Sequence, residues 1–161
     1  MCGIIGISSN KSVSANIINS LKKLEYIGYD SAGVATLFGG EINEVKSEGR
    51  VDNLEQNFDL KSLKGNIGIG HVRWATHGFP NSINAHPHSS DNVSVVHNGI
   101  IENSTILKKH LVNKGHTFKS QTDTEVIVHL ITENLKTMEL EEAKTKTLKQ
   151  LHGSFALGII F

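Results

Sequence analysis

The sequence predicts one domain of the α+β class that extends over residues 1–161. Short β-rich segments alternate with segments whose apolar residues recur at helical spacing, which is typical of a mixed architecture. No internal repeat, low-complexity stretch or linker divides the chain. A chain of 161 residues is long enough for a single hydrophobic core.

The first half of the chain is expected to form four strands and two helices. Ser14 is placed to cap a helix whose apolar face holds positions 17, 18, 21 and 24. Two short strands flank Gly39 and Gly40, and a pair of glycines in this place is typical of a hairpin turn. The expected strands are 2–8, 34–38, 42–46 and 66–73, and a weaker helix is expected over 51–60.

The second half is expected to combine two strands with three helices. Thr122 and Glu125 have the spacing of a capping box, which predicts a helix that begins there. Gly115 is expected to close the preceding helix. The other expected elements are a helix from Asn103 or Ser104 to Asn113, strands at 93–98 and 155–161, and a helix at 141–151.

Composition and charge argue against several classes of protein. Hydrophobic residues make up 38% of the chain and charged residues 20%, unlike a disordered, collagen-like or coiled-coil chain. Sixteen basic residues balance sixteen acidic ones, so no basic excess favours nucleic acid or a membrane surface as a partner. The apolar runs are too short to span a bilayer, and one cysteine cannot form an internal disulfide. We therefore expect a cytoplasmic protein.

Cys2 is the first candidate for chemistry, because it directly follows the initiator Met1. Removal of Met1 would leave a thiol and a free α-amino group on the same residue. An α-amino group with a pKa of about 7.7 can act as a base at neutral pH, and a thiolate is a strong nucleophile. The alternative for an isolated cysteine is a small, buried apolar side chain.

Six motifs accompany this cysteine. They are MCGIIGI at 1–7, LEYIGYDSAG at 24–33, HVRWATHG at 71–78, NAHPH at 84–88, HNGIIEN at 97–103 and QTDTEV at 121–126. In their order and spacing they resemble the glutaminase domain of the glutamine–fructose-6-phosphate aminotransferases, which are class II glutamine amidotransferases. The resemblance implies the four-layer αββα sandwich of the N-terminal nucleophile hydrolases.

The resemblance implies a catalytic role for Cys2, Asn98 and Gly99. Cys2 would attack the side-chain amide of glutamine, form a thioester and release ammonia. Asn98 and the backbone N–H of Gly99 would donate hydrogen bonds to the tetrahedral oxyanion, and each such donor is typically worth about 3 kcal/mol. Taken alone, an Asn-Gly pair after a strand is typical of a type I′ hairpin turn, which is the alternative here.

Five further residues would bind the substrate glutamine according to the same resemblance. Arg73 suits the α-carboxylate, and Asp123 suits the α-ammonium group. Thr76 and His77 would belong to the loop that folds over bound glutamine, and Trp74 would be the residue that gates the passage of ammonia. The alternatives are a strand-end salt bridge for Arg73, a first-turn helix charge for Asp123 and core packing for Trp74.

Nine histidines raise the alternative of a metal-binding protein, with His86 and His88 in H-x-H spacing. No carboxylate-rich, Cys-x-x-Cys or HEXXH pattern accompanies them, so no metal site is expected. The glycine-rich segments lack nucleotide-binding spacing, and no cofactor is expected.

The chain departs from the family in two respects. Ile27 stands where the family has an arginine close to the catalytic cysteine, and isoleucine cannot supply that charge. The family's glutaminase domain also continues past the position of Phe161, and the sugar isomerase domain that binds fructose 6-phosphate is absent. We therefore expect the N-terminal portion of a glutaminase domain, with glutamine and a separately encoded remainder as partners. The competing hypothesis is an impaired fragment that acts only as a binding or pairing module.

Overall fold

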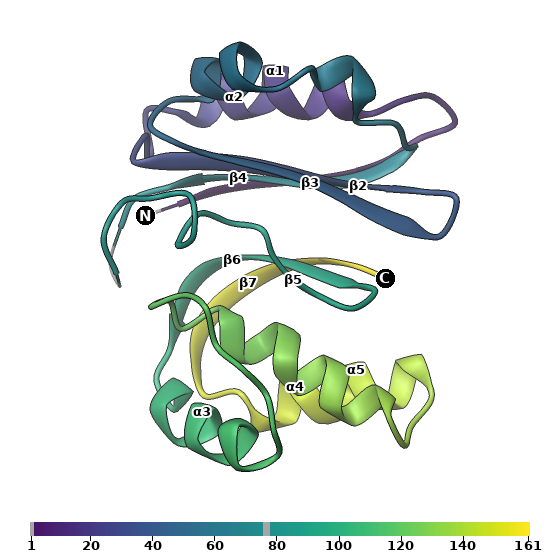
Figure 1. The fold of residues 1–161 in the computed structure, drawn as a ribbon, viewed down its shortest axis with the longest axis vertical. Coiled ribbons are helices and arrows are strands. Elements are labelled where there is room, and N and C mark those ends of the chain that lie inside the picture. Colours follow the sequence, from purple (N-terminus) through teal and green to yellow (C-terminus); the bar gives the residue numbers. More distant parts are fainter. Residues whose placement is uncertain (1, 76–77) are drawn as a thin grey trace.

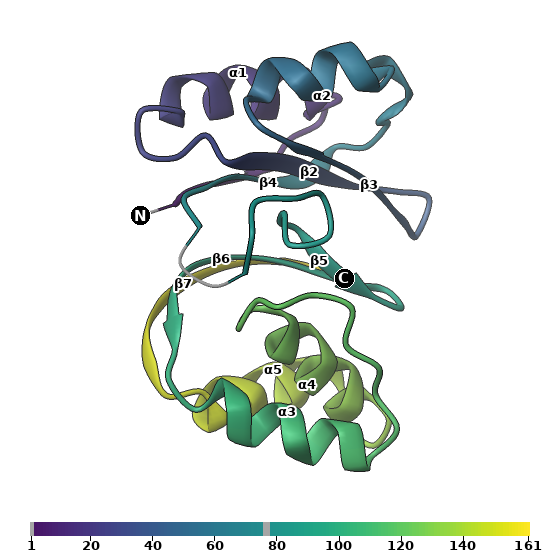
Figure 2. The same ribbon diagram turned by 60° about the vertical axis from the view of Figure 1, so that its left-hand side comes forward.

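The computed structural model describes residues 2–75 and 78–161, so that Met1, Thr76 and His77 lie outside the described residues. Two antiparallel sheets pack face to face between two layers of helices (Figure 1). The order helix, sheet, sheet, helix is equally plain after a turn of the molecule (Figure 2). This is the four-layer αββα sandwich that the family resemblance implied, and the prediction of the fold class is confirmed.

The first sheet has the strand order β1-β4-β2-β3. Its strands are β1 (Gly3–Ser8), β2 (Ser31–Phe38), β3 (Glu41–Glu48) and β4 (Ile67–Arg73). Gly39 and Gly40 connect β2 to β3 with φ of 62° and 84°, which is the positive-φ turn that the glycine pair predicted. The outer face is covered by α1 (Ser14–Leu24) and α2 (Val51–Asn57), and a short 3₁₀ helix follows at Leu60–Ser62 (Figure 1).

The second sheet has the strand order β5-β6-β7. Its strands are β5 (His88–Ser90), β6 (Val93–Ile101) and β7 (Gly153–Ile160). The sequence did not indicate β5, because three residues are too few to show an alternating pattern. The outer face is covered by α3 (Ser104–Asn113), α4 (Glu125–Leu135) and α5 (Leu140–Gln150), as Figure 2 shows.

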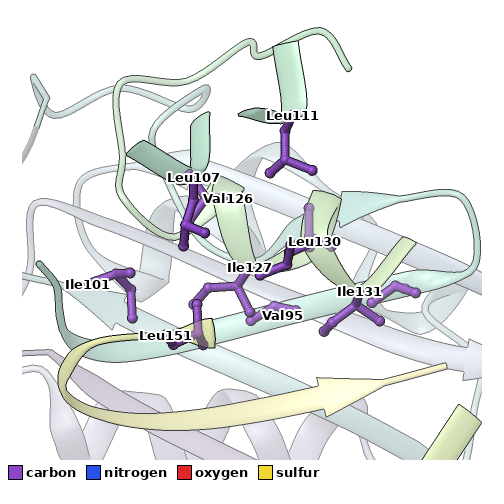
Figure 3. Packing of buried hydrophobic residues seen from close by; sticks show 11 residues of the cluster. Val95, Ile101, Leu107, Leu111, Val126, Ile127, Leu130, Ile131 and Leu151 are labelled. Carbon is purple, nitrogen blue, oxygen red and sulfur yellow. The ribbon is translucent and has the colours of Figure 1, made fainter. Parts of the chain in front are cut away.

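Each sheet shares a hydrophobic core with its own helices. In α4 the side chains of Ile127 and Ile131 are almost completely buried, and they lie over β6 with neighbours from α3 (Figure 3). Replacing a buried isoleucine of this kind by alanine typically costs about 2–5 kcal/mol. A smaller cluster between the two sheets consists of Ala35, Ile69, Val96 and Ile160. Among the described residues, no helix is long and apolar enough to cross a membrane.

The start of α4 differs from its prediction in one detail. The helix begins close to the expected place, with Thr124 at the N-cap position. A capping box of Thr122 with Glu125 is nevertheless wrong. The Glu125 carboxylate accepts hydrogen bonds from the backbone nitrogens of Lys119 (2.9 Å) and Ser120 (2.7 Å) instead. The loop before α4 folds back over the helix, so its backbone N–H groups bind the Glu125 carboxylate in place of the capping-box contact.

Candidate active site

Most of the predicted site residues line one small pocket. Cys2 directly precedes β1, Arg73 ends β4, and Asp123 lies just before α4, so the pocket draws on both sheets and on one helix start. Asn98 contacts Cys2 beside the pocket, whereas Thr76 and His77 lie outside the described residues. The residues that line the pocket are Cys2, Arg73, Trp74, His86, His97, Gly99, Thr122, Asp123 and Thr124.

Asn98 lies against the backbone of Cys2. The backbone nitrogen of Cys2 donates a hydrogen bond to Oδ1 of Asn98 across 3.3 Å. Because that nitrogen is a donor, the atom that faces it must be the amide oxygen, and Nδ2 of Asn98 remains available as a donor. Asn98 and Gly99 lie within β6 and pair with Ala156 and Phe155 of β7. The hairpin-turn alternative for this pair is therefore wrong.

The close approach of β7 explains why position 99 is a glycine. Gly99 has a φ of 139°, which residues with a side chain rarely adopt. A Cβ atom at this position would lie 2.2 Å from the carbonyl oxygen of Ser154 and 2.7 Å from Cα of Phe155. Any side chain would push β6 away from β7 and change the wall of the pocket.

The thiol of Cys2 lies beside the peptide groups of Trp74. The backbone N–H of Trp74 donates to Sγ across 3.5 Å, and the Trp74 carbonyl oxygen lies 3.6 Å from the same sulfur. Burial raises the pKa of the Cys2 thiol above its usual value, whereas the Trp74 N–H and the charge of Arg73 act to lower it. Since the net shift of the pKa is upward, the thiol is mainly protonated at neutral pH and needs a base for catalysis.

Trp74 itself is not a core residue. Its side chain is 46% exposed, and its ring meets the ring of Tyr29 edge-on at a centroid distance of 6.0 Å. The alternative of core packing is therefore wrong for this residue. Trp74 lines the pocket while its side chain stays partly exposed.

The turn after α1 holds the end of β4 in place. Oδ2 of Asp30 accepts a hydrogen bond from the backbone nitrogen of Ala75 (2.7 Å), and the Asp30 nitrogen donates to the carbonyl oxygen of Arg73 (3.0 Å). A Cβ atom at Gly28 would lie 2.6 Å from the carbonyl carbon of Arg73, so only glycine allows this contact. Ile27 directly precedes this glycine and is half-buried.

Arg73 lines the pocket from the end of β4, and Asp123 lines it from the segment that precedes α4. Arg73 is only 3% exposed, and its guanidinium donates to the carbonyl oxygens of Gly78 and Phe79, both at 3.4 Å. Asp123 is also buried, and its Oδ2 accepts a hydrogen bond from the backbone nitrogen of Ile101 across 2.8 Å. A cation and an anion that line one small pocket can receive the two charged groups of an amino acid.

Four buried histidines adjoin the pocket. The rings of His71 and His86 lie 4.1 Å apart and those of His86 and His88 lie 4.9 Å apart, while Nε2 of His71 is 3.0 Å from the carbonyl oxygen of His97. Burial lowers the pKa of His71 and of His88 to about 3, and it lowers the pKa of His86 well below its ordinary value. These three imidazoles are therefore neutral at pH 7.

In the sequence these histidines indicate only possible metal ligands. Within residues 2–75 and 78–161, no group of three or more His, Cys, Asp or Glu residues is arranged to hold a metal ion. His86 and His97 line the pocket instead, together with Thr122 and Thr124. The NAHPH, HNGIIEN and QTDTEV motifs are the signals that could have identified these four residues in advance.

Two comparisons of sequence agree with this geometry. A family described as a glutamine amidotransferase domain matches residues 73–161, which is more than half of the chain. The glutamine–fructose-6-phosphate aminotransferase (isomerizing) of Mesorhizobium japonicum is 54% identical over 100% of this chain, and that of Pyrococcus horikoshii is 52% identical over 100% of it. The chain spans only 27% of the length of either relative.

A solved structure agrees as well. The glutamine phosphoribosylpyrophosphate amidotransferase from B. subtilis, complexed with ADP and GMP, matches with a TM-score of 0.87 at 30% identity. The match covers 99% of this chain and 35% of that chain. The chain therefore belongs to the glutamine amidotransferase domain family, as its resemblance to the glutaminase domain of the glutamine–fructose-6-phosphate aminotransferases predicted.

Proposed function

We propose that this protein hydrolyses the side-chain amide of glutamine to glutamate and ammonia, with Cys2 as the nucleophile. The observation that carries the proposal is the pocket that Cys2 lines together with Arg73, Gly99 and Asp123, with Asn98 in contact with Cys2. Membership of the glutamine amidotransferase domain family supports glutamine as the substrate. The convergence of these residues disfavours a module that only binds.

In the first step, the amine of Cys2 acts as the base. After removal of Met1 the Cys2 nitrogen is an α-amino group, which Oδ1 of Asn98 can orient. The amine takes the thiol proton, and Sγ bonds to the side-chain carbonyl carbon of glutamine while the π electrons move to the oxygen. Nδ2 of Asn98 and the N–H of Gly99 donate to this oxyanion.

In the later steps, the Cys2 amine acts first as an acid and then again as a base. Collapse of the tetrahedral intermediate breaks the carbon–nitrogen bond, and the α-ammonium group of Cys2 protonates the departing nitrogen, so that ammonia leaves. Water then attacks the thioester with the amine as base. A second tetrahedral intermediate uses the same two oxyanion donors and releases glutamate and the free thiol.

Substrate binding is assigned to the charged residues of the pocket. Arg73 binds the α-carboxylate of glutamine, for which its planar guanidinium is suited, and Asp123 binds the α-ammonium group. Trp74, a lining residue with a half-exposed ring, contacts the substrate. Thr76 and His77 complete the binding loop according to the family resemblance.

The acceptor of the ammonia lies outside this chain in our proposal. The chain forms the N-terminal portion of a glutaminase domain and requires a remainder, in the same or a separate polypeptide, with a sugar isomerase domain that binds fructose 6-phosphate. The names of the relatives support fructose 6-phosphate as the acceptor, and its amination with isomerization would give glucosamine 6-phosphate. We also propose a cytoplasmic location, which the single cysteine supports.

The direct test is release of ammonia from glutamine by the purified protein. We expect turnover with glutamine and far less with asparagine, whose amide is one methylene closer to the groups that Arg73 and Asp123 bind. Cys2→Ala is expected to abolish turnover while glutamine binding, measured by calorimetry, is retained. Turnover by Cys2→Ala equal to that of the unsubstituted protein would contradict the proposal.

A further inference from the structure

We infer that Asn84 and Gln121 form a positioning pair that holds Arg73 and Asp123 at a fixed separation. This inference rests on the proposed function, in which these two charged residues bind the ends of one glutamine molecule. Neither Asn84 nor Gln121 lines the pocket, and both come from motifs, NAHPH and QTDTEV, whose first residues have no assigned role.

The two amide side chains make a reciprocal set of hydrogen bonds. Oδ1 of Asn84 accepts from the backbone nitrogen of Gln121 (2.9 Å), and Nδ2 of Asn84 donates to Oε1 of Gln121 (3.2 Å). Nδ2 also donates to the carbonyl oxygen of Phe79 across 2.9 Å. Asn84 is 1% exposed, so its own amide is shielded from water and needs these partners within the protein.

The orientation of both amides follows from their backbone partners. The backbone nitrogens of Gln121 and Phe79 can only donate, and they face Oδ1 of Asn84 and Oε1 of Gln121 (3.3 Å for Phe79). Rotation of the Asn84 amide by half a turn would place an oxygen against two acceptors and a nitrogen against a donor. The pair therefore tolerates one arrangement only.

One end of this set reaches Arg73. The carbonyl oxygens of Gly78 and Phe79 accept from the Arg73 guanidinium, both at 3.4 Å. Gly78 has a φ of 77°, and a Cβ atom there would lie 2.7 Å from Nδ2 of Asn84 and 2.9 Å from Cβ of Gln121. The segment at 78–79 is thus fixed on one side by the amide pair and supports the guanidinium on the other.

The other end reaches the start of α4. Gln121 precedes Asp123 by two residues, and its backbone nitrogen is the atom that Asn84 holds. Asp123 is tied to β6 through the backbone nitrogen of Ile101 (2.8 Å). Hydrogen bonds therefore link Arg73 to Gln121 through Phe79 and Asn84, and the chain from Gln121 leads directly to Asp123.

The substitution Asn84→Asp separates this role from a loss of packing. It keeps the shape and the Oδ1 acceptor, but it places a second oxygen against the carbonyl of Phe79 and against Oε1 of Gln121, in a buried place. Ser82→Ala, at an exposed position of the same loop, serves as the matched control.

The experiment measures kcat and KM for glutamine in the purified protein. We expect Asn84→Asp to raise KM at least about ten-fold with kcat within about three-fold, because binding geometry is disturbed and Cys2 is not. Ser82→Ala is expected to stay within about three-fold of the unsubstituted KM. The KM of Asn84→Asp should fall again as the pH is lowered from about 8 to about 6.5, because a protonated carboxyl group regains a donor.

An unchanged KM in Asn84→Asp, or a loss confined to kcat, would overturn the inference. Hydrogen exchange of the Phe79 amide gives a second readout that does not depend on turnover. If the unsubstituted protein releases no ammonia, the proposed function fails, and the pair is judged by this exchange alone. The exchange rate of the Phe79 amide must then be higher in Asn84→Asp than in the unsubstituted protein, and it must be unchanged in Ser82→Ala. Equal rates in the two variants would overturn the inference.

Discussion

The backbone nitrogen of Cys2 and the side-chain oxygen of Asn98 lie 3.3 Å apart, although 96 residues separate them in the sequence. Cys2 precedes β1 of the first sheet, and Asn98 lies within β6 of the second. The contact therefore forms only when the two sheets pack face to face. It directs Oδ1 of Asn98 toward the nitrogen that the proposed mechanism uses as a base, and it leaves Nδ2 for the oxyanion.

Removal of Met1 is the first requirement of that mechanism. We expect the intact mass of the native protein to lack the initiator residue, and an electrophilic glutamine analogue to label Cys2. Prior incubation with glutamine should protect the thiol from the label. Retention of Met1 on protein that hydrolyses glutamine would show that the free amine is not the base.

Asn98→Asp tests the oxyanion donor. The variant keeps an oxygen toward the Cys2 nitrogen, but it replaces the donor Nδ2 with a second, negatively charged oxygen. We expect kcat to fall about 10²–10³-fold, with a smaller change in KM, because the donor acts mainly in the transition state. Asn113→Asp, the same change at an exposed position of α3, should leave kcat unchanged. Equal kcat values for the two variants would remove Asn98 from the mechanism.

Arg73→Ala and Asp123→Ala are expected to weaken glutamine binding. Removal of one partner of a charge-assisted hydrogen bond typically costs about 1.5–3 kcal/mol, which is roughly 10- to 150-fold in Kd. Lys146→Ala, at an exposed position of α5, should bind glutamine as the unsubstituted protein does. Calorimetric titration with glutamine measures all three, and equal affinities would show that the pocket does not bind the charged ends of the substrate.

The buried histidines predict a loss of stability in acid. The pKa of His71 and of His88 is about 3 in the folded protein against an ordinary value of 6.5, so the unfolded chain takes up protons first as the pH falls. This contribution to stability is complete above pH 6.5 and is lost as the pH falls from there toward 3. Each histidine adds a slope of up to about 1.4 kcal/mol per pH unit.

Urea unfolding at a series of pH values measures this slope. His71→Gln removes one titrating group and should reduce the slope, whereas His152→Gln, on an exposed residue, should not. If the free energy of unfolding is independent of pH across this window, the histidines are not neutral and buried as the structure has them.

Most elements of the fold could be predicted because their signals are local. The turn at Gly39 and Gly40 requires positive φ, and glycine supplies it without help from the rest of the chain. The three residues of β5 carry no such signal, since this strand exists through its pairing with β6. The hydrogen bonds of Glu125 were missed for a related reason, because the loop that supplies their donors is placed by tertiary packing.

By itself the sequence determined which residues carry the chemistry: the thiol of Cys2, the amide of Asn98, and the opposite charges of Arg73 and Asp123 all follow from motifs that can be read along the chain. Only the tertiary structure decided that they meet. Their contacts join two sheets across long separations in sequence, and such contacts cannot be predicted from local periodicity. The same holds for the neutral state of His71 and for the hydrogen bonds between Asn84 and Gln121, since burial and the direction of a neighbouring N–H exist only in the folded chain.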